Sequence, residues 1–300
     1  MSRKAIEIGG KRLSLSNLEK ELYPSCGFTK ANVLEYYGQM AGSILPHLKD
    51  RALTLKRYPD GVEHEYFFEK RCPTHHPDWV QTAEVSRGSK QMTVCLANNL
   101  ATLLWVENLA SLELHVPLAR AGAPETPDAM VFDLDPGEGA DILDCARVAL
   151  VLKELFSRLR LTGYPKTSGQ KGLHVFVPLN RPETTFDDTK QFSKAVAVIM
   201  QKNYPDLVTS KMAKDQRTGR VFINWSQNDA SKTMVCVYSL RAREKPYVSC
   251  PLEWGELELA TKSGDPIRLQ ITHAEALNRI GTSGDLFREV LIKKQKLPHL

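Results

Sequence analysis

Hydrophobic and polar residues recur along this chain with two periods, one typical of helices and one typical of strands. Apolar residues at helical spacing predict helices from Thr29 to Pro46, from about Asn99 to Leu109, after Asp141 and over residues 188–201. Shorter apolar runs predict strands over residues 52–55, 65–68, 92–96, 112–116, 130–136, 164–167, 173–177, 221–225 and 233–240. Residues 12–28 are predicted to be a loop, and residues 73–90 are polar and rich in turn formers. From Pro251 onward the pattern predicts loops and two short helices.

The predicted strand over residues 130–136 ends in two carboxylates. Because side chains of a strand alternate between its faces, Asp133 and Asp135 lie on one face and Leu134 on the other. Pro136 cannot donate a ladder hydrogen bond, so the strand is expected to stop there. Two neighbouring carboxylates repel each other unless a cation lies between them, and Mg²⁺ or Mn²⁺ prefers such oxygen ligands. The alternative interpretation is a strand that simply leads into a solvated turn.

A glycine-containing turn follows soon after this acidic strand. Residues 164–167 and 173–177 form a predicted hairpin around Ser168-Gly169-Gln170-Lys171-Gly172. The glycines let the backbone approach an anion, exposed N–H groups can bind it, and Lys171 adds positive charge. This pattern favours a triphosphate cradle, to which His174 on the second strand could donate. An ordinary hairpin turn and a buried core histidine remain the alternatives.

Basic and aromatic residues of the N-terminal part suggest contacts with phosphates and bases. Lys20 and Lys30 flank a predicted turn and could grip a phosphate, although two solvated lysines are the alternative. Phe67 and Phe68 alternate on a strand, so at most one is core and the other could stack on a base. Later in the chain, the i, i+2 spacing of Arg241 and Arg243 predicts two guanidinium groups on one strand face.

Composition narrows the class of protein. The chain has 300 residues, of which 42% are hydrophobic, so it can bury a proper core. Its first residues contain no apolar export signal and no apolar run reaches membrane-spanning length, so we expect a cytoplasmic protein without membrane contact. The formal net charge is +5, yet residues 121–144 carry seven acids and no Lys or Arg. A basic protein with an acidic centre suits a polyanion held beside metal ions, but ordinary fluctuation would also explain it.

The cysteines argue for a reducing compartment. Six cysteines are scattered without a C-x-x-C pair, which favours reduced thiols over a disulfide framework. Cys72 lies near His75 and His76, but no second ligand pair stands at zinc-finger spacing, so a zinc site is the weaker interpretation.

Several motifs taken together resemble one known family. In chain order they are Ser16-Asn17-Leu18-Glu19-Lys20, Arg57-Tyr58-Pro59-Asp60-Gly61, Phe67-Phe68-Glu69-Lys70, Asp133-Leu134-Asp135-Pro136, Ser168-Gly169-Gln170-Lys171-Gly172-Leu173-His174 and Tyr238-Ser239-Leu240-Arg241-Ala242-Arg243. This series resembles the polymerase domain of bacterial ligase D, and it covers nearly the whole chain in order.

The resemblance implies an α+β archaeo-eukaryotic primase-type fold, with mixed and antiparallel sheets flanked by helices and an active site in a cleft. We expect one domain over residues 1–300, with a DNA-end-binding part over about 1–120, a catalytic part over about 121–250 and C-terminal helices over about 251–300. The implied activity is template-directed nucleotidyl transfer in nonhomologous end joining, with two Mn²⁺ or Mg²⁺ ions and a preference for ribonucleoside triphosphates. The implied partners are DNA ends and gaps with a 5′-phosphate, Ku, and ligase or nuclease domains, in the bacterial cytoplasm beside the nucleoid.

The resemblance also assigns roles to single residues. Asp133 and Asp135 match the metal ligands, and His115 matches a histidine beside the metal centre. Residues matching the nucleotide-binding pocket are Lys56, Ser168, Gly169, Lys171, Gly172, His174, Gln227 and Arg241. Residues matching DNA contacts are Asn17, Lys20, Lys30, Arg57, Phe67, Phe68 and Arg217. Of these, Lys20 and Lys30 match the pair that grips a 5′-phosphate, while Arg217 also lines the active-site pocket.

One position departs from the family pattern. Asn224 stands where the family carries a third catalytic aspartate. An amide keeps a carbonyl ligand but loses a negative charge, so we expect weaker metal binding at the primer hydroxyl and slow chemistry with substrate binding largely kept. The alternative hypothesis is a catalytically silent module that binds DNA ends and nucleotides and only bridges or protects them.

Overall fold

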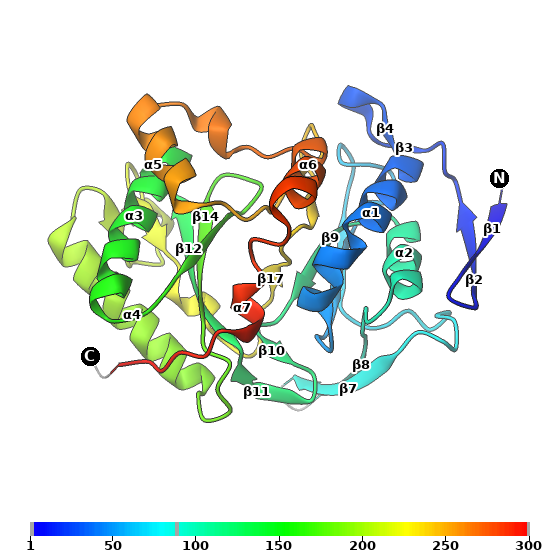
Figure 1. The fold of residues 1–300 in the computed structure, drawn as a ribbon, viewed down its shortest axis with the longest axis horizontal. Coiled ribbons are helices and arrows are strands. Elements are labelled where there is room, and N and C mark those ends of the chain that lie inside the picture. The colour runs from blue at the N-terminus through cyan, green and yellow to red at the C-terminus, as the bar shows by residue number, and fades with distance from the viewer. Residues whose placement is uncertain (1–2, 88–89, 299–300) are drawn as a thin grey trace. The chain divides into compact units, whose positions relative to one another are not determined.

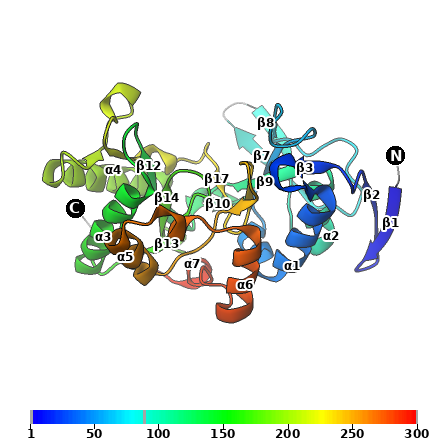
Figure 2. The same cartoon turned by 90° about the horizontal axis from the view of Figure 1, so that it is seen from above.

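The computed structural model describes residues 3–87 and 90–298. The chain divides into two compact units, and each is built from three separate segments. Unit 1 contains Met1–Gly122, Thr233–Val248 and Thr272–Asp285, and unit 2 contains Ala123–Lys232, Ser249–Ile271 and Leu286–Leu300. The blue and cyan segments of Figures 1 and 2 belong to unit 1, and the green to yellow segments belong to unit 2. Each unit therefore depends on segments that lie far apart in the sequence.

Unit 1 is organised around a four-stranded antiparallel sheet. Its strand order is β17 (Met234–Val235), β9 (Ser111–Val116), β5 (Thr54–Arg57) and β6 (Phe67–Glu69). Helix α1 (Lys30–Leu48) packs against α2 (Leu100–Asn108) and α6 (His273–Ser283), and α2 also contacts β9. Figure 2 shows α1 beside α2. The predicted hairpin of residues 52–68 is confirmed, with Lys56 opposite Phe68 and Arg57 opposite Phe67.

Helix α1 begins where its sequence predicts but ends later. Thr29 accepts a hydrogen bond from the backbone N–H of Asn32, whose side chain accepts from Thr29 in return. Tyr37 and Met40 are fully buried, so the helix covers the core of unit 1 with an apolar face. The predicted end at Pro46 is wrong, because Pro46 lies inside the last turn. A proline removes only one N–H there, and the next turn still closes from Lys49 to Leu45.

Unit 1 also contains short strand pairs. They are β1 (Arg3–Ile8) with β2 (Lys11–Ser16), β3 (Glu21–Tyr23) with β4 (Phe28–Thr29), β7 (Thr82–Arg87) with β8 (Lys90–Cys95), and β18 (Leu240–Arg241) with β19 (Tyr247–Val248). Only β8 and the first residue of β18 overlap strands that the hydrophobic pattern predicted. The loop predicted over residues 12–28 is thus partly strand, as is the turn-rich segment 73–90. Strand β1 is mostly exposed, so no buried face produces a clear apolar pattern. Strand β10 (Ala119–Arg120) completes the described strands of unit 1.

The predicted strand over residues 233–240 is interrupted. Only Met234–Val235 and Leu240–Arg241 are strands, and Tyr238 between them has a φ of 65° in the left-handed region. Arg241 pairs with Glu113, whereas Arg243 pairs with Glu244. The idea that both arginines serve one face of a continuous strand is therefore wrong.

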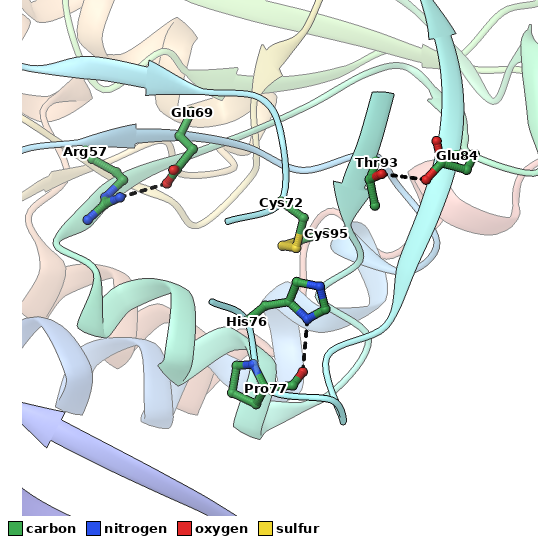
Figure 3. Close-up of a disulfide and its surroundings, with 8 residues drawn as sticks. All are labelled: Arg57, Glu69, Cys72, His76, Pro77, Glu84, Thr93 and Cys95. Atoms are coloured by element: carbon green, nitrogen blue, oxygen red, sulfur yellow. Dashed lines mark hydrogen bonds and ion pairs between the residues drawn. A yellow bond between two sulfur atoms is a disulfide. The ribbon is translucent and has the colours of Figure 1, made fainter. Parts of the chain in front are cut away.

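A disulfide in unit 1 corrects the expectation of reduced thiols. Cys72, which follows β6, is bonded to Cys95 at the end of β8 (Figure 3). The backbone N–H of Cys72 also donates to the carbonyl of Thr93, so the two segments lie edge to edge. The spacing of 23 residues hides this contact in the sequence. Because the Cys72 sulfur is in a disulfide, it is not a thiolate ligand, and the zinc interpretation fails.

Unit 2 is organised around a five-stranded sheet with β12 (Ala129–Pro136) at its centre. The strand order is β13 (Tyr164–Thr167), β14 (Leu173–Pro178), β12, β16 (Val221–Ile223) and β15 (Val208–Thr209). All neighbours are antiparallel except β15 and β16. Phe132 and Leu134 of β12 are fully buried in its core. Strand β11 (Ala123–Pro127) precedes β12 in the chain.

Helices cover this sheet. Helices α3 (Ile142–Arg158) and α4 (Phe186–Asn203) both contact β12, α7 (Glu289–Ile292) contacts β14, and α5 (Trp254–Ser263) packs beside α3 (Figure 1). Asp141 caps α3 as predicted, by accepting from the N–H groups of Leu143 and Asp144. The C-terminal part contains α5, α6 and α7 where two short helices were expected. Short 3₁₀ turns are Pro24–Cys26, Lys214–Gln216, Trp225–Gln227 and Pro266–Leu269.

The predicted α+β class with mainly antiparallel sheets is confirmed by this arrangement. No helix among the described residues is long and apolar enough to cross a membrane.

Candidate active site

The two aspartates of β12 point away from the core of unit 2, as the strand period predicts. Asp133 and Asp135 are partly exposed, whereas Leu134 between them is fully buried. In the register, Asp133 lies opposite His174 of β14, and Asp135 lies opposite Phe222 of β16. We call Asp133 and Asp135 the carboxylate pair. Because β12 lies between β14 and β16, side chains of both strands flank this pair.

Asn224 is bound directly to Asp133. Its side-chain Nδ2 donates to Asp133 Oδ2 at 3.0 Å, and its backbone N–H donates to the Asp133 carbonyl at 2.8 Å. An ionised carboxylate only accepts hydrogen bonds, so the NH₂ end of the amide must face Asp133. The Oδ1 atom of Asn224 instead accepts from Ser226 Oγ at 2.8 Å. The amide thus turns its donor, and not its carbonyl, toward the carboxylate pair.

The carboxylate pair carries an excess of negative charge. Burial and the neighbouring Asp133 raise the pKa of Asp135 to about 7, while the charge of Arg217 acts in the opposite direction. His174 Nε2 lies 3.3 Å from the other oxygen of Asp133. Two carboxylates that disfavour each other's ionisation fit a divalent cation with oxygen ligands. Among residues 3–87 and 90–298, no group of three or more His, Cys, Asp or Glu side chains is arranged to hold a metal.

The predicted glycine turn packs against the end of β12. A Cβ atom on Gly172 would lie 2.1 Å from the Leu134 carbonyl, so only glycine fits there. Gly169 has a φ of 70°, in the left-handed region that glycine tolerates. Ser168 Oγ accepts from the N–H groups of Gln170 and Gly172, so these two donors already serve the turn. The exposed Lys171 lies at the tip of the turn.

Two further residues expected at the site follow in unit 2. The Arg217 guanidinium lies 3.8 Å from the ring centroid of Phe222 and influences the pKa of Asp135. Gln227 ends the 3₁₀ turn that begins directly after Asn224. Asp229 binds Lys190 at 2.6 Å, and this hydrogen bond lowers its pKa.

In unit 1, four residues form a second charge centre, which we call the Glu113 centre. It consists of Glu113, Lys56, His115 and Arg241. Glu113 Oε2 lies 3.0 Å from His115 Nε2 and 3.3 Å from an Arg241 nitrogen, and Oε1 lies 3.6 Å from Lys56 Nζ. One carboxylate thus gathers Lys56 and Arg241, which are expected to bind the nucleotide, and His115, which is expected beside the metal centre.

Glu113 was not predicted. Burial alone would raise its pKa, but the hydrogen bond from His115 and the charges of Arg241 and Lys56 hold it at about 2. Burial lowers the pKa of Lys56 and of His115, against the attraction of Glu113. A signal was present in the sequence, because Glu113 and His115 share one face of a strand whose opposite face is apolar.

The aromatic residues of the β5–β6 hairpin are exposed. Phe67 and Phe68 are 44% and 50% exposed, so neither is core. The Arg57 guanidinium lies 5.0 Å from the Phe67 ring centroid and donates to Glu69 (Figure 3). Tyr66, which was missed, is also half exposed, and Lys56 Nζ lies 4.0 Å from its ring centroid. Three consecutive exposed aromatic residues were the available signal.

The two lysines expected at a 5′-phosphate differ in environment. Lys20 Nζ binds Asp60 at 2.7 Å on the surface. Lys30 is almost completely buried and donates to the Ser16 carbonyl at 2.7 Å. Burial, Arg57 and Lys20 lower the pKa of Lys30 to about 8, so these three cations are close enough to interact. Asn17, which has a φ of 54°, accepts from the Lys20 backbone N–H.

Comparison with known proteins points to one family. Residues 29–287 match the model of the LigD primase-polymerase domain. The chain is 38% identical over 288 residues to the multifunctional non-homologous end joining DNA repair protein LigD of Mycobacterium tuberculosis H37Rv, covering 93% of this chain and 37% of the relative. It is 34% identical over 247 residues to the bifunctional non-homologous end joining protein LigD of Bacillus subtilis, covering 82% of this chain and 40% of the relative. The chain thus spans well under half the length of these relatives.

A solved structure agrees with this match over nearly its whole length. The polymerase domain of Mycobacterium tuberculosis ligase D in complex with DNA superposes with a TM-score of 0.87 and 38% identity. The superposition covers 95% of this chain and 99% of that one.

Proposed function

Because the chain belongs to the LigD primase-polymerase family, we propose that it is a template-directed nucleotidyltransferase that fills gaps and extends DNA ends in nonhomologous end joining. The observation that carries this proposal is the carboxylate pair at the end of β12, where the pKa of Asp135 is raised to about 7 by burial and by Asp133. A divalent cation bound between the two carboxylates would relieve their mutual repulsion.

Three residues would hold two Mn²⁺ or Mg²⁺ ions: Asp133, Asp135 and, through its carbonyl, Asn224. When bound there, the ions would acidify the primer 3′-hydroxyl and neutralise charge on the triphosphate. Lys171 offers a charged donor to the triphosphate, and Ser168, Gly169, Gly172 and His174 shape the turn beside the pair. Arg217 and Gln227 complete the proposed pocket in unit 2.

Unit 1 contributes phosphate and base contacts in this proposal. Lys56 and Arg241 bind the nucleotide, for which we propose a preference for ribose, and His115 acts beside the metal centre. The charges of Lys20 and Arg57 act on Lys30, and in this proposal Lys20 and Lys30 bind a downstream 5′-phosphate while Arg57 contacts the DNA. Phe67 and Phe68 stack on the template strand, and Asn17 holds the Lys20 backbone. We further propose that the protein acts beside the bacterial nucleoid, together with Ku and with ligase or nuclease domains.

Asn224 makes the proposed polymerase slow. Its amide donates to Asp133 and its carbonyl is engaged by Ser226, so a metal ligand must first be freed by rotating the amide. The missing negative charge also weakens attraction for the second cation.

The same observation favours a second candidate function, a silent module that binds DNA ends and nucleotides. Primer extension separates the two. The substrate is gapped DNA with a 5′-phosphate, supplied with Mn²⁺ and each ribonucleotide or deoxyribonucleotide in turn. Template-directed incorporation by the chain or by Asn224→Asp supports the polymerase. Tight DNA binding without incorporation by either form supports the silent module.

A further inference from the structure

We propose that Glu113 is a positioning residue, which holds Lys56, His115 and Arg241 as one preorganised group for the nucleoside triphosphate. The inference rests on the function proposed above and adds a residue that the family resemblance did not supply. Its basis is that one fully buried carboxylate contacts all three of these cationic or titratable side chains.

Both oxygens of the carboxylate are engaged. Oε2 binds His115 and Arg241, and Oε1 faces Lys56 and accepts from the backbone N–H of Ala242 at 3.2 Å. The partners come from three strands, because Lys56 lies opposite Glu113 on β5 and Arg241 lies on β18. Arg241 follows Glu113 by more than a hundred residues. A long arginine side chain loses conformational entropy when it is ordered, and the ion pair with Glu113 offsets this cost for Arg241.

Exposure shows that Glu113 itself does not meet the ligand. The Glu113 side chain is 0% exposed, whereas 11% of Lys56, 14% of His115 and 9% of Arg241 remain accessible. An approaching anion therefore touches the cations and not the carboxylate. Two cations against one carboxylate leave a formal charge of +1 when His115 is neutral. That sign suits a phosphate oxygen.

A second buried glutamate in unit 1 supplies the matched control. Glu107 of α2 is also 0% exposed, but neither of its carboxyl oxygens has a hydrogen-bond partner among the described residues. Burial raises the pKa of Glu107, which favours its neutral form, whereas the partners of Glu113 lower its pKa and favour the ionised form. The difference between these two glutamates is the set of cations that surrounds Glu113. Replacing Glu107 by glutamine thus removes no charge from the folded protein.

The first test compares Glu113→Gln with Glu107→Gln in an Asn224→Asp background. Binding of ATP is titrated with Mn²⁺ present, and single-turnover extension opposite thymine gives the rate and the ATP concentration at half-maximal rate. We expect Glu113→Gln to weaken ATP binding about tenfold, with a smaller change in the maximal rate. Glu107→Gln should change neither value. Equal ATP affinity in Glu113→Gln and its parent would overturn the inference.

Two further variants exclude a purely structural role. Glu113→Asp keeps the charge but shortens the side chain, so it should bind ATP with an affinity between those of parent and Glu113→Gln. If Glu113→Gln does not fold, Glu113→Asp decides, and unchanged ATP binding there rejects the proposal. Arg241→Met should weaken ATP binding, and its effect should not add fully to that of Glu113→Gln, because both changes dismantle one group. Full additivity would contradict preorganisation.

The binding titration keeps this inference separate from the proposed function. If Asn224→Asp incorporates no nucleotide but still binds ATP, the polymerase proposal fails, and the ratio of ATP affinities still tests Glu113. If incorporation is rapid and the Glu113→Gln ratio is one, the polymerase proposal stands and the positioning role fails.

Discussion

Buried acidic groups have pKa values shifted in opposite directions in the carboxylate pair of unit 2 and in the Glu113 centre of unit 1. At the pair, burial and a like charge raise the pKa of Asp135 to about 7. At the centre, cations overcome burial and hold the pKa of Glu113 at about 2. The carboxylate pair therefore carries an excess of negative charge, and the Glu113 centre carries an excess of positive charge. The sign of that excess indicates the class of ligand, a divalent cation for the pair and an anion for the centre.

The largest expected effect comes from removing one member of the carboxylate pair. In the Asn224→Asp background, Asp133→Ala should decrease single-turnover incorporation at least about 1000-fold, because the cation loses a charged ligand. Gapped DNA should still bind, since all the proposed DNA contacts except Arg217 lie on unit 1. Incorporation at the parental rate in Asp133→Ala would refute the metal assignment.

A smaller effect, in the opposite direction, is expected when charge is added to the pair. Asn224→Asp should raise the incorporation rate about 100-fold, mainly in kcat, because each 1.4 kcal/mol of lost charge stabilisation corresponds to tenfold in rate. Asn203→Asp adds the same charge at the exposed end of α4 and should leave the rate unchanged. If Asn224→Asp stays as slow as the parent while binding gapped DNA, the silent module is the better account.

The positively charged lysines of unit 1 predict a preference for phosphorylated DNA. At pH 7 and low salt, a downstream 5′-phosphate should tighten binding of gapped DNA about tenfold through Lys20 and Lys30. The pKa of Lys30 is about 8, so this preference should fall as the pH rises from 7 to 9. Fluorescence anisotropy of phosphorylated and unphosphorylated gaps measures it.

Two variants serve as controls for this preference. Lys30→Met should reduce the preference for the phosphate and remove its pH dependence, whereas Lys4→Met, on the exposed β1, should do neither. If the parent binds phosphorylated and unphosphorylated gapped DNA with equal affinity at low salt, Lys20 and Lys30 do not bind the 5′-phosphate.

The smallest effects concern stability without metal. The folded pKa of Asp135 lies above its unfolded value of 3.8, so the free energy of unfolding falls as the pH rises from about 4 to 7. At pH 8 with EDTA, Asp135→Asn should therefore stabilise the protein by about 1 kcal/mol after allowance for solvent screening.

The Glu113 centre should respond with the opposite sign. Its folded pKa lies below the unfolded value of 4.5, so its contribution is present above pH 4.5 and lost as the pH falls toward 2. At pH 8, Glu113→Gln should destabilise the protein by about 2 kcal/mol, because buried cations lose their partner. Urea denaturation of both variants measures the pair of shifts. Shifts of the same sign would show that the two centres do not differ as proposed.

Local patterns in the sequence were sufficient for several elements. Thr29 and Asp141 cap their helices because a capping side chain needs only residues within its own first turn. The face shared by Asp133 and Asp135 follows from the strand period, and the glycine turn follows from its own residues. The α+β class and the family resemblance rest on such local signals in chain order.

Tertiary structure decided whatever depends on segments distant in the sequence. The Cys72–Cys95 disulfide needs two segments brought edge to edge, and the interruption at Tyr238 shows only in the folded backbone. The cations around Glu113 come from β5 and β18, whose positions no local pattern contains. The orientation of the Asn224 amide is likewise set by Asp133 across the sheet and by Ser226 in the next turn. The alternation of side chains along a strand shows which face of the sheet a residue occupies. The ionisation and the interaction partners of that residue depend on which strands lie next to it.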